Sequence, residues 1–226
     1  MVNSVSKNSN DNKNKIMKLI DALNWRYAVK RMTGKKIDQE KIDNILEATR
    51  LSASSMGLQP YSIIVVENEE LKKKLQPAAF NQPQIVESSH LLIFAAWDNV
   101  TEHNVDEYLN EIASVRGVTF ESLAGFKASM MNIVNGRTKE QKYEWAARQA
   151  YIAFGTAIAA AALEEVDATP MEGFNPNAID GILGFKEKGL RSVTILALGY
   201  RDANLDALAS AKKVRRHKDK LILTIA

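Results

Sequence analysis

The segment WAARQAYIAFGTAIAAAALEE, residues 145–165, constrains the fold more than any other part of the chain. As a helix it is apolar on all sides and rich in alanine and glycine, so it has no polar face to turn toward water. Such a helix needs close neighbours around its circumference. We expect it to be the central helix, packed on several other elements.

Helical and strand patterns alternate along the rest of the chain. Short apolar runs bounded by polar or turn residues predict strands at 61–68, 90–97 and 191–200. Their near-continuous apolar character predicts burial on both faces. Amphipathic helices are expected at 16–25 and after an Asp38 N-cap, and a long polar helical region at 103–143. The pattern indicates a layered arrangement with few strands and much helix.

Composition excludes several classes of protein. The 226-residue chain has no cysteine, which rules out disulfides, iron–sulfur clusters and cysteine nucleophiles. Its net charge of +3 is too small to indicate nucleic-acid binding. No apolar stretch approaches the roughly 18 residues of a membrane helix, and residues 1–15 lack the apolar core of a signal peptide. We expect a cytoplasmic protein without membrane contact, with a disordered extension over 1–15 and a single domain over 16–226.

The common catalytic motifs are absent as well. The chain has no G-x-G-x-x-G after a strand, no P-loop, no G-x-S-x-G and no H-E-x-x-H. The three histidines are isolated from one another in the sequence, so no metal site is expected.

Basic residues near both ends of the chain are candidates for an anion site. Arg26 and Lys30 lie four apart after the first helix, and the run KKVRRHKDK occupies 212–220. Two such distant segments can meet to bind a phosphate dianion. A charge run taken alone more often forms solvated surface, and a basic tail can also contact nucleic acid.

Two loops have turn chemistry that also suits a ligand. In DATPMEGFN, residues 167–175, Pro170 and Gly173 predict a turn directly after the apolar helix. This turn is either a plain helix-to-strand connection or a place where the backbone approaches a flat ligand. The loop LSASSMGLQP, residues 51–60, presents the same choice.

Seven segments in chain order resemble the flavin-dependent nitroreductase family, especially its oxygen-insensitive NAD(P)H nitroreductase and dihydropteridine reductase branch. They are RYAVKRM, SASSMGLQPY, NQPQIVESSHLLIF, EWAARQAYIAFG, TPMEGF, GFKEKG and KKVR. The resemblance runs from about Ile16 to the C-terminus and implies an α+β fold. This fold is a three-layer α-β-α sandwich with a mostly antiparallel sheet, in an intertwined homodimer with FMN at its interface. The closing KLILTIA, residues 220–226, would be the C-terminal strand exchanged with the partner.

The resemblance also implies roles for individual residues. Arg26 matches the arginine that holds the FMN phosphate, and Lys213 and Arg215 match the pair that completes this site. Lys30 matches a lysine near N1 and O2 of the isoalloxazine, where a cation stabilises the negative charge of reduced flavin. Asn81 matches an amide that hydrogen-bonds the pyrimidine edge.

Glu172 and Gly173 match a turn whose backbone amides face flavin N5, so these two and Lys30 are the residues with implied catalytic roles. Ser54 and Ser55 match residues that reach the FMN bound mainly by the other subunit. The further cofactor neighbours implied are Tyr27, Ala28, Gly57, Gln84, Pro170 and Met171.

The chain departs from its relatives at several of these positions. Ala28 stands where they have a serine, and Gln84 where they have a second lysine. We therefore expect a flavin potential lower than in two-lysine relatives, and a potential measured equal or higher would refute this. Met56-Gly57 replaces a Thr-Asn pair. The aromatic gate over the flavin corresponds to either Met131 or Phe126, and this residue would line the substrate pocket.

The activity implied is that of an FMN-dependent oxidoreductase. NAD(P)H would reduce the flavin, and a flat, electron-poor acceptor such as a nitroaromatic or a quinone would then take two electrons in a ping-pong cycle. One alternative is an FMN-binding carrier or sensor with little turnover. A second and weaker alternative is a nucleic-acid binder that uses the basic tail.

Overall fold

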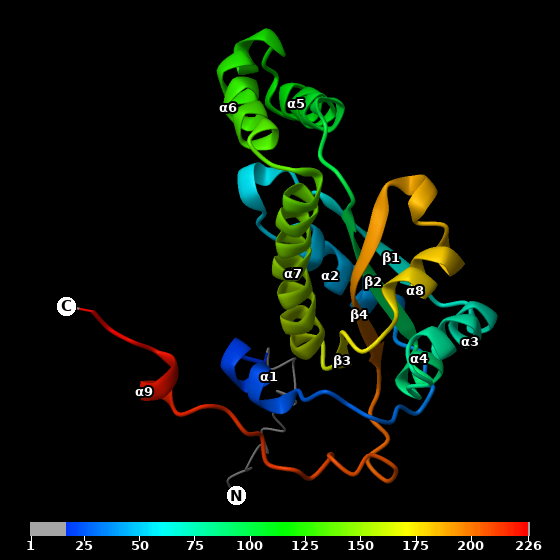
Figure 1. Cartoon of the computed structure of the whole chain (residues 1–226). Coiled ribbons are helices and arrows are strands. Elements are labelled where there is room, and N and C mark those ends of the chain that lie inside the picture. Colours follow the sequence, from blue (N-terminus) through cyan, green and yellow to red (C-terminus); the bar gives the residue numbers. More distant parts are fainter. Residues whose placement is uncertain (1–16, 226) are drawn as a thin grey trace, which may run out of the picture.

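The computed structural model describes residues 17–225 (Figure 1). The expected extension over 1–15 lies outside these residues. The helices of the described chain are α1 (Leu19–Trp25), α2 (Gln39–Arg50), α3 (Glu69–Ala78), α4 (Gln84–Glu87), α5 (Glu102–Arg116), α6 (Ala124–Asn135), α7 (Lys139–Leu163), α8 (Pro176–Leu183) and α9 (Lys218–Leu221). The strands are β1 (Tyr61–Val66), β2 (His90–Trp97), β3 (Asp167–Met171) and β4 (Leu190–Gly199).

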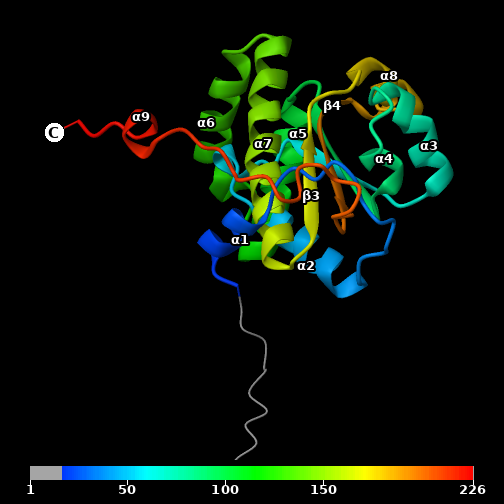
Figure 2. The same ribbon diagram turned by 90° about the horizontal axis from the view of Figure 1, so that it is seen from below.

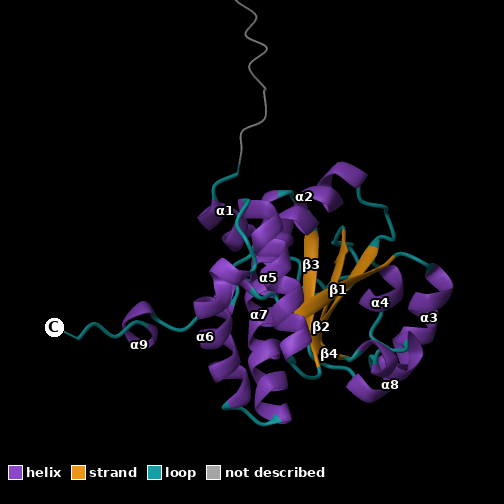
Figure 3. Ribbon diagram, turned by 90° about the horizontal axis from the view of Figure 1, so that it is seen from above, coloured by secondary structure: helices purple, strands orange, loops and turns teal. Residues whose placement is uncertain are grey.

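The four strands form one antiparallel sheet in the order β1-β2-β4-β3. Helices α2 and α7 cover one face of this sheet, and α3, α4 and α8 cover the other (Figure 3). The predicted α-β-α sandwich with a mostly antiparallel sheet is therefore confirmed.

Strand β2 shows how the two cores are built. Alternate side chains of a strand point to opposite faces, and Leu91 and Ile93 accordingly pack with α3, α4 and α8, whereas Leu92 and Phe94 pack with α2 and α7. The predicted burial on both faces holds for β2. It is wrong for β1, where Val65 is exposed, because β1 lies at the edge of the sheet.

Helix α7 lies against the sheet, α1 and α2, in agreement with the central position expected for it (Figure 2). Its buried side is made of Ala150, Ala153, Phe154, Ala157 and Ala161. Its opposite side carries Ile152 and Leu163, which are exposed, so no other part of residues 17–225 covers it. The expectation of neighbours on all sides is therefore only partly met within one chain.

The prediction of a turn at 167–175 is wrong for the first five of these residues. Residues Asp167–Met171 form β3, an edge strand paired with β4. Pro170 weakens the strand pattern in the sequence, but an edge strand can dispense with one backbone N–H. Pairing with β4 outweighs the local preference for a turn. Gly173 lies in the turn that follows the strand.

The remaining parts extend from this body. Helices α5 and α6 form a projecting pair with a small apolar core of their own (Figure 1). After β4 the chain runs back past α1 without long regular elements, and its end points away from the body. A strand is expected over 220–226, but in this single chain its first two residues, Lys220 and Leu221, belong to α9. Ala226 lies outside the described residues. Among residues 17–225, no helix combines the length and apolarity needed to cross a membrane.

Candidate functional site

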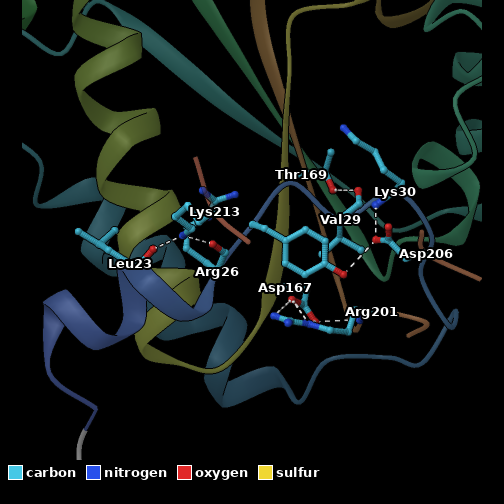
Figure 4. Close-up of polar contacts among 10 residues, drawn as sticks. Leu23, Arg26, Val29, Lys30, Asp167, Thr169, Arg201, Asp206 and Lys213 are labelled. Atoms are coloured by element: carbon cyan, nitrogen blue, oxygen red, sulfur yellow. Dashed lines mark hydrogen bonds and ion pairs between the residues drawn. The ribbon is translucent and has the colours of Figure 1, made fainter. Parts of the chain in front are cut away.

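The segment from Arg26 to Lys30 follows α1 and runs beside β3, to which it is joined by a parallel bridge between Ala28 and Ala168. The Thr169 hydroxyl donates to the Val29 carbonyl at 2.5 Å. The Lys30 amide donates to the Asp206 carboxylate at 2.7 Å. These bonds fix the backbone of the segment from two sides (Figure 4).

This segment and the C-terminal stretch line one hollow of about 450 Å³. Arg26 and Lys30 come from the first segment, and Lys213 and Arg215 come from the second. The fold therefore brings together the four cations that the sequence analysis selects. The other residues lining the hollow are Asn24, Trp25, Tyr27, Ala28, Pro170, Arg201, Leu208, Ala209, Ala211 and Lys212.

Arg26 is the most unusual group of this hollow. Its Nε and one Nη atom are buried without a hydrogen-bond partner among residues 17–225. Burial lowers the pKa of Arg26, and the nearby Arg215 lowers it further. A buried guanidinium with free donors next to another cation is favourable only when an anion neutralises it. The hollow therefore has the chemistry of an anion site.

Lys213 supports this site from the end of α1. Its Nζ donates to the carbonyls of Leu23 and Arg26, as Figure 4 shows. A cation at the C-terminal end of a helix satisfies carbonyls that have no partner within the helix. Burial lowers the pKa of Lys213, with Arg26 and Arg215 adding to the effect. Lys213 is thus both an anchor and part of the positive charge.

Arg201 is a residue of the hollow that the sequence analysis missed. Its guanidinium binds the Asp167 carboxylate with N–O distances of 2.5 to 3.0 Å and stacks 4.4 Å from the Trp25 ring centroid and 4.7 Å from that of Tyr27. The charge of Arg201 is therefore paired with Asp167, unlike that of Arg26, for which no ion pair is found among residues 17–225. The only signal in the sequence is its place directly after a predicted strand.

The turn at Glu172 and Gly173 follows β3, so it continues from the side of the hollow formed by Pro170. Two side chains far away in the sequence hold this turn. Gln82 donates to the Gly173 carbonyl at 2.7 Å, and the Tyr151 hydroxyl of α7 donates to the Glu172 carboxylate. Burial raises the pKa of Tyr151, and the bond to Glu172 raises it further. Sequence reasoning missed both residues, although both fall in segments that carry the family resemblance.

Asn81 and Gln84 have different surroundings. Asn81 is exposed and has a left-handed φ of 56°, a conformation that asparagine tolerates better than most residues. Gln84 is 3% exposed; its Nε2 donates to the Val29 carbonyl at 3.4 Å, and its Oε1 has no partner in the described part of the chain. Gln84 thus packs beneath the segment from Arg26 to Lys30 rather than at the surface of the hollow.

The serine loop, defined here as residues 54–57, does not line the hollow. The Ser54 hydroxyl accepts a bond from the Gln59 amide at 2.9 Å, and the Ser55 amide donates to Gln149 of α7 at 2.8 Å. Gly57 is required by the loop itself: its φ is +74°, and a Cβ there would lie 2.2 Å from the Tyr108 hydroxyl oxygen.

Helix α7 stands between the serine loop and the turn at Glu172. The loop is bonded to Gln149 and the turn to Tyr151. Side chains two positions apart leave a helix in directions roughly 200° apart. One chain therefore holds its serine loop and its Glu172 turn on opposite sides of α7.

Of the two gate candidates, Met131 lines an apolar hollow of about 520 Å³ on α6, and Phe126 does not. Phe126 is exposed. Which of the two residues gates the flavin stays a prediction.

Taken together, these features define an α+β protein whose sheet is covered by helices on both faces and which has a hollow lined by cations beside the edge strand β3. The chain belongs to the nitroreductase family: the model of the Nitroreductase family matches residues 23–200. It is 34% identical over 209 residues to the Major NAD(P)H-flavin oxidoreductase of Aliivibrio fischeri, which covers 88% of this chain and 94% of that protein.

Solved structures share the fold at lower identity. The Bacillus subtilis protein YdfN, described as a nitroreductase, superposes with a TM-score of 0.80 at 18% identity and covers 90% of this chain and 97% of its own. An Exiguobacterium sibiricum protein, described as a nitroreductase and solved in complex with FMN, gives a TM-score of 0.78 at 19% identity and covers 92% and 98%. These matches agree with the resemblance found in the sequence.

Proposed function

We propose that this member of the nitroreductase family reduces flat, electron-poor acceptors, such as nitroaromatics or quinones, by a ping-pong transfer of two electrons. Family membership and a relative named as an NAD(P)H-flavin oxidoreductase make the chain an NAD(P)H-dependent oxidoreductase with FMN as its cofactor. The acceptor class and the order of the steps are the parts that remain to be measured.

The observation that carries the proposal is the pair of buried Arg26 nitrogens for which the described chain, residues 17–225, offers no partner. They lie in a hollow shared with Lys213 and Arg215, and a phosphate monoester supplies the acceptor oxygens and negative charge that this group lacks. The residues present therefore fit the phosphate of FMN. FMN, when bound, supplies the chemistry of accepting a hydride from NAD(P)H and passing it to the acceptor.

The chain's own residues would divide the remaining work. Arg26, Lys213 and Arg215 would bind the phosphate and so orient the ring system. Lys30 would supply positive charge to the ring, and the backbone of the Glu172–Gly173 turn would border its reactive part. No side-chain acid or base is required, since the acceptor takes its proton from water. The uncovered side of α7 supports a homodimer in which the partner's serine loop completes the site.

The purified protein tests the proposal directly. We expect it to be yellow, to lose its visible absorbance when NADH or NADPH is added without oxygen, and to regain it on addition of a nitroaromatic or quinone. A yellow protein that does not bleach would instead be an FMN carrier or sensor. A colourless protein that shifts DNA would contradict the FMN assignment and favour nucleic-acid binding.

Two substitutions separate binding from turnover. Lys30→Ala should slow flavin reduction while FMN stays bound, because Lys30 acts on the ring rather than on the phosphate. Arg215→Ala should loosen FMN, because it removes phosphate charge. Stopped-flow reduction and FMN titration measure the two effects. Loss of FMN from the Lys30 variant and not from the Arg215 variant would reverse the roles.

A further inference from the structure

Asp206 joins the two segments that carry the cations. One carboxylate oxygen accepts from the Lys30 amide at 2.7 Å and from the Tyr27 hydroxyl at 3.0 Å. The other accepts from the Leu208 amide at 2.9 Å. Only 4% of Asp206 is exposed. A single buried carboxylate therefore receives donors from both sides of the hollow.

These donors keep Asp206 ionised. Burial alone would raise its pKa, but the bonds from the Lys30 and Leu208 amides and from Tyr27 outweigh burial and lower it. Burial and the bond to Asp206 in turn raise the pKa of Tyr27 to about 12. The neutral tyrosine thus remains a donor, and the pairing is stable around neutral pH.

The C-terminal stretch depends on this contact. Within residues 17–225, the hydrogen bonds that tie residues 203–212 to another segment all come from Asp206; the others in that stretch are local. Lys213 and Arg215 follow directly after this stretch. Directly before the stretch, the Asp202 amide donates to the Arg31 carbonyl at 3.0 Å. Between that bond and the bonds of Lys213, Asp206 is the residue that holds the course of the chain toward Lys213 and Arg215.

We propose that Asp206 is a positioning residue for the phosphate site, holding the C-terminal cations at the distance from Arg26 at which one phosphate contacts them all. The proposal rests on the proposed function, since that phosphate belongs to FMN. Asp206 does not contact the phosphate itself, because a carboxylate would repel it. Its effect passes through the backbone of Lys30 and the course of residues 206–213.

Substitution by asparagine removes this arrangement at little cost in volume. An amide has one acceptor oxygen, so either the Lys30 amide or the Leu208 amide then faces an NH2 group. We expect Asp206→Asn to raise the FMN dissociation constant about tenfold, corresponding to the loss of one charge-assisted hydrogen bond. Riboflavin, which lacks the phosphate, should change less than about twofold.

Asp180→Asn is the matched control. Asp180 also accepts from a backbone amide, that of Ser192 at 2.9 Å, but it lies on α8 away from the hollow. This variant should bind FMN and riboflavin as the wild type does. Asp206→Glu keeps the charge but displaces it by one methylene. It should therefore also weaken the binding of FMN more than that of riboflavin, and it replaces the asparagine variant in the test if that variant does not fold.

Titrations of FMN and riboflavin followed by flavin fluorescence give the outcome. Equal weakening of both ligands in Asp206→Asn would mean a general structural role and overturn the proposal, as would unchanged binding of FMN. A wild type that binds no FMN would instead overturn the proposed function.

If the wild type binds no FMN, the melting temperature of the apo protein still tests the role of Asp206. Inorganic phosphate should raise the melting temperature of the wild type and of Asp180→Asn, and raise that of the Asp206 variants much less. An equal rise in all variants, or no rise in the wild type, would overturn the proposal.

Discussion

The cation hollow and the serine loop differ in what a single chain leaves unpaired. In the hollow, two buried nitrogens of Arg26 have no partner among residues 17–225. Besides burial, the positive Arg215 nearby lowers the pKa of Arg26 more than the negative Asp167 raises it. In the loop, the Ser54 hydroxyl and the Ser55 amide are already bonded within the chain. The hollow thus has free donors that suit an anion, whereas the donors and acceptors of the loop are partly satisfied within the chain. We infer that the loop contributes to a site only through a second copy of the chain.

The largest expected effect is that of Arg26→Ala, which tests the hollow. The substitution removes the unpaired donors and should raise the FMN dissociation constant by about 30–100-fold, equivalent to roughly 2–3 kcal/mol for hydrogen bonds to a charged group. Arg26→Lys keeps the charge without the fork of donors and should fall between. An FMN titration measures both, and an affinity within twofold of the wild type would contradict the phosphate assignment.

The second effect tests the other half of the comparison. Ile152 on the uncovered side of α7 is 48% exposed, and Ile152→Asp should separate a dimer into monomers because it places a charge in an apolar interface. FMN affinity should then fall about tenfold, since the partner's loop is lost. Val115→Asp, at an exposed apolar position of α5, is the control. Sedimentation velocity should show a monomer for the first variant only; a wild-type monomer that binds FMN fully would refute the second-copy interpretation.

A smaller effect concerns pH. Because Lys213 has a lowered pKa, its ammonium is present at neutral pH and is lost as the pH rises through a value below the usual 10.5. FMN affinity should therefore decline by about threefold between neutral pH and about pH 10. Lys213→Arg keeps its charge over this range and should remove most of the decline. An identical decline in both proteins would show that another group titrates.

The smallest effects distinguish the two serines. Ser54→Ala should lower the free energy of unfolding by about 1 kcal/mol, because the partly buried Gln59 amide loses its acceptor. It should leave the intrinsic affinity of the hollow unchanged. Ser55→Ala should leave stability unchanged and weaken FMN binding about twofold through the partner site. Urea unfolding of the apo protein and FMN titration provide the two measurements. The reverse pattern would mean that Ser54, and not Ser55, faces the partner.

Several elements of the fold could be predicted from local patterns. The β2 range and the central α7 follow from hydrophobic runs whose length and composition have few alternatives. Strand β3 could not be predicted because Pro170 and Asp167 are residue types that rarely occur in strands. It becomes a strand through its pairing with β4. Exposure of one side of α7 could not be predicted either, because it depends on which surfaces a single chain has available to cover it.

The candidate site divides in the same way. Arg26, Lys213 and Arg215 could be selected as cations that match a family pattern, and the fold gathers them in one hollow. Asp206 could not, since an isolated aspartate in a loop carries no pattern of its own and its partner Lys30 lies 176 residues away. Gln82 and Tyr151 were missed for the same reason, because each acts on a turn far from it in the sequence.

Composition, periodicity and motif order are therefore enough to establish the family, the layered α+β fold and the identity of the main cations, because these properties reside in neighbouring residues. Three further properties depend on the folded chain: which donors stay unpaired, which carboxylate holds the hollow together, and which side of α7 lacks a cover. They depend on contacts between distant segments, and such contacts are decided by packing and burial of the whole chain rather than by local preference.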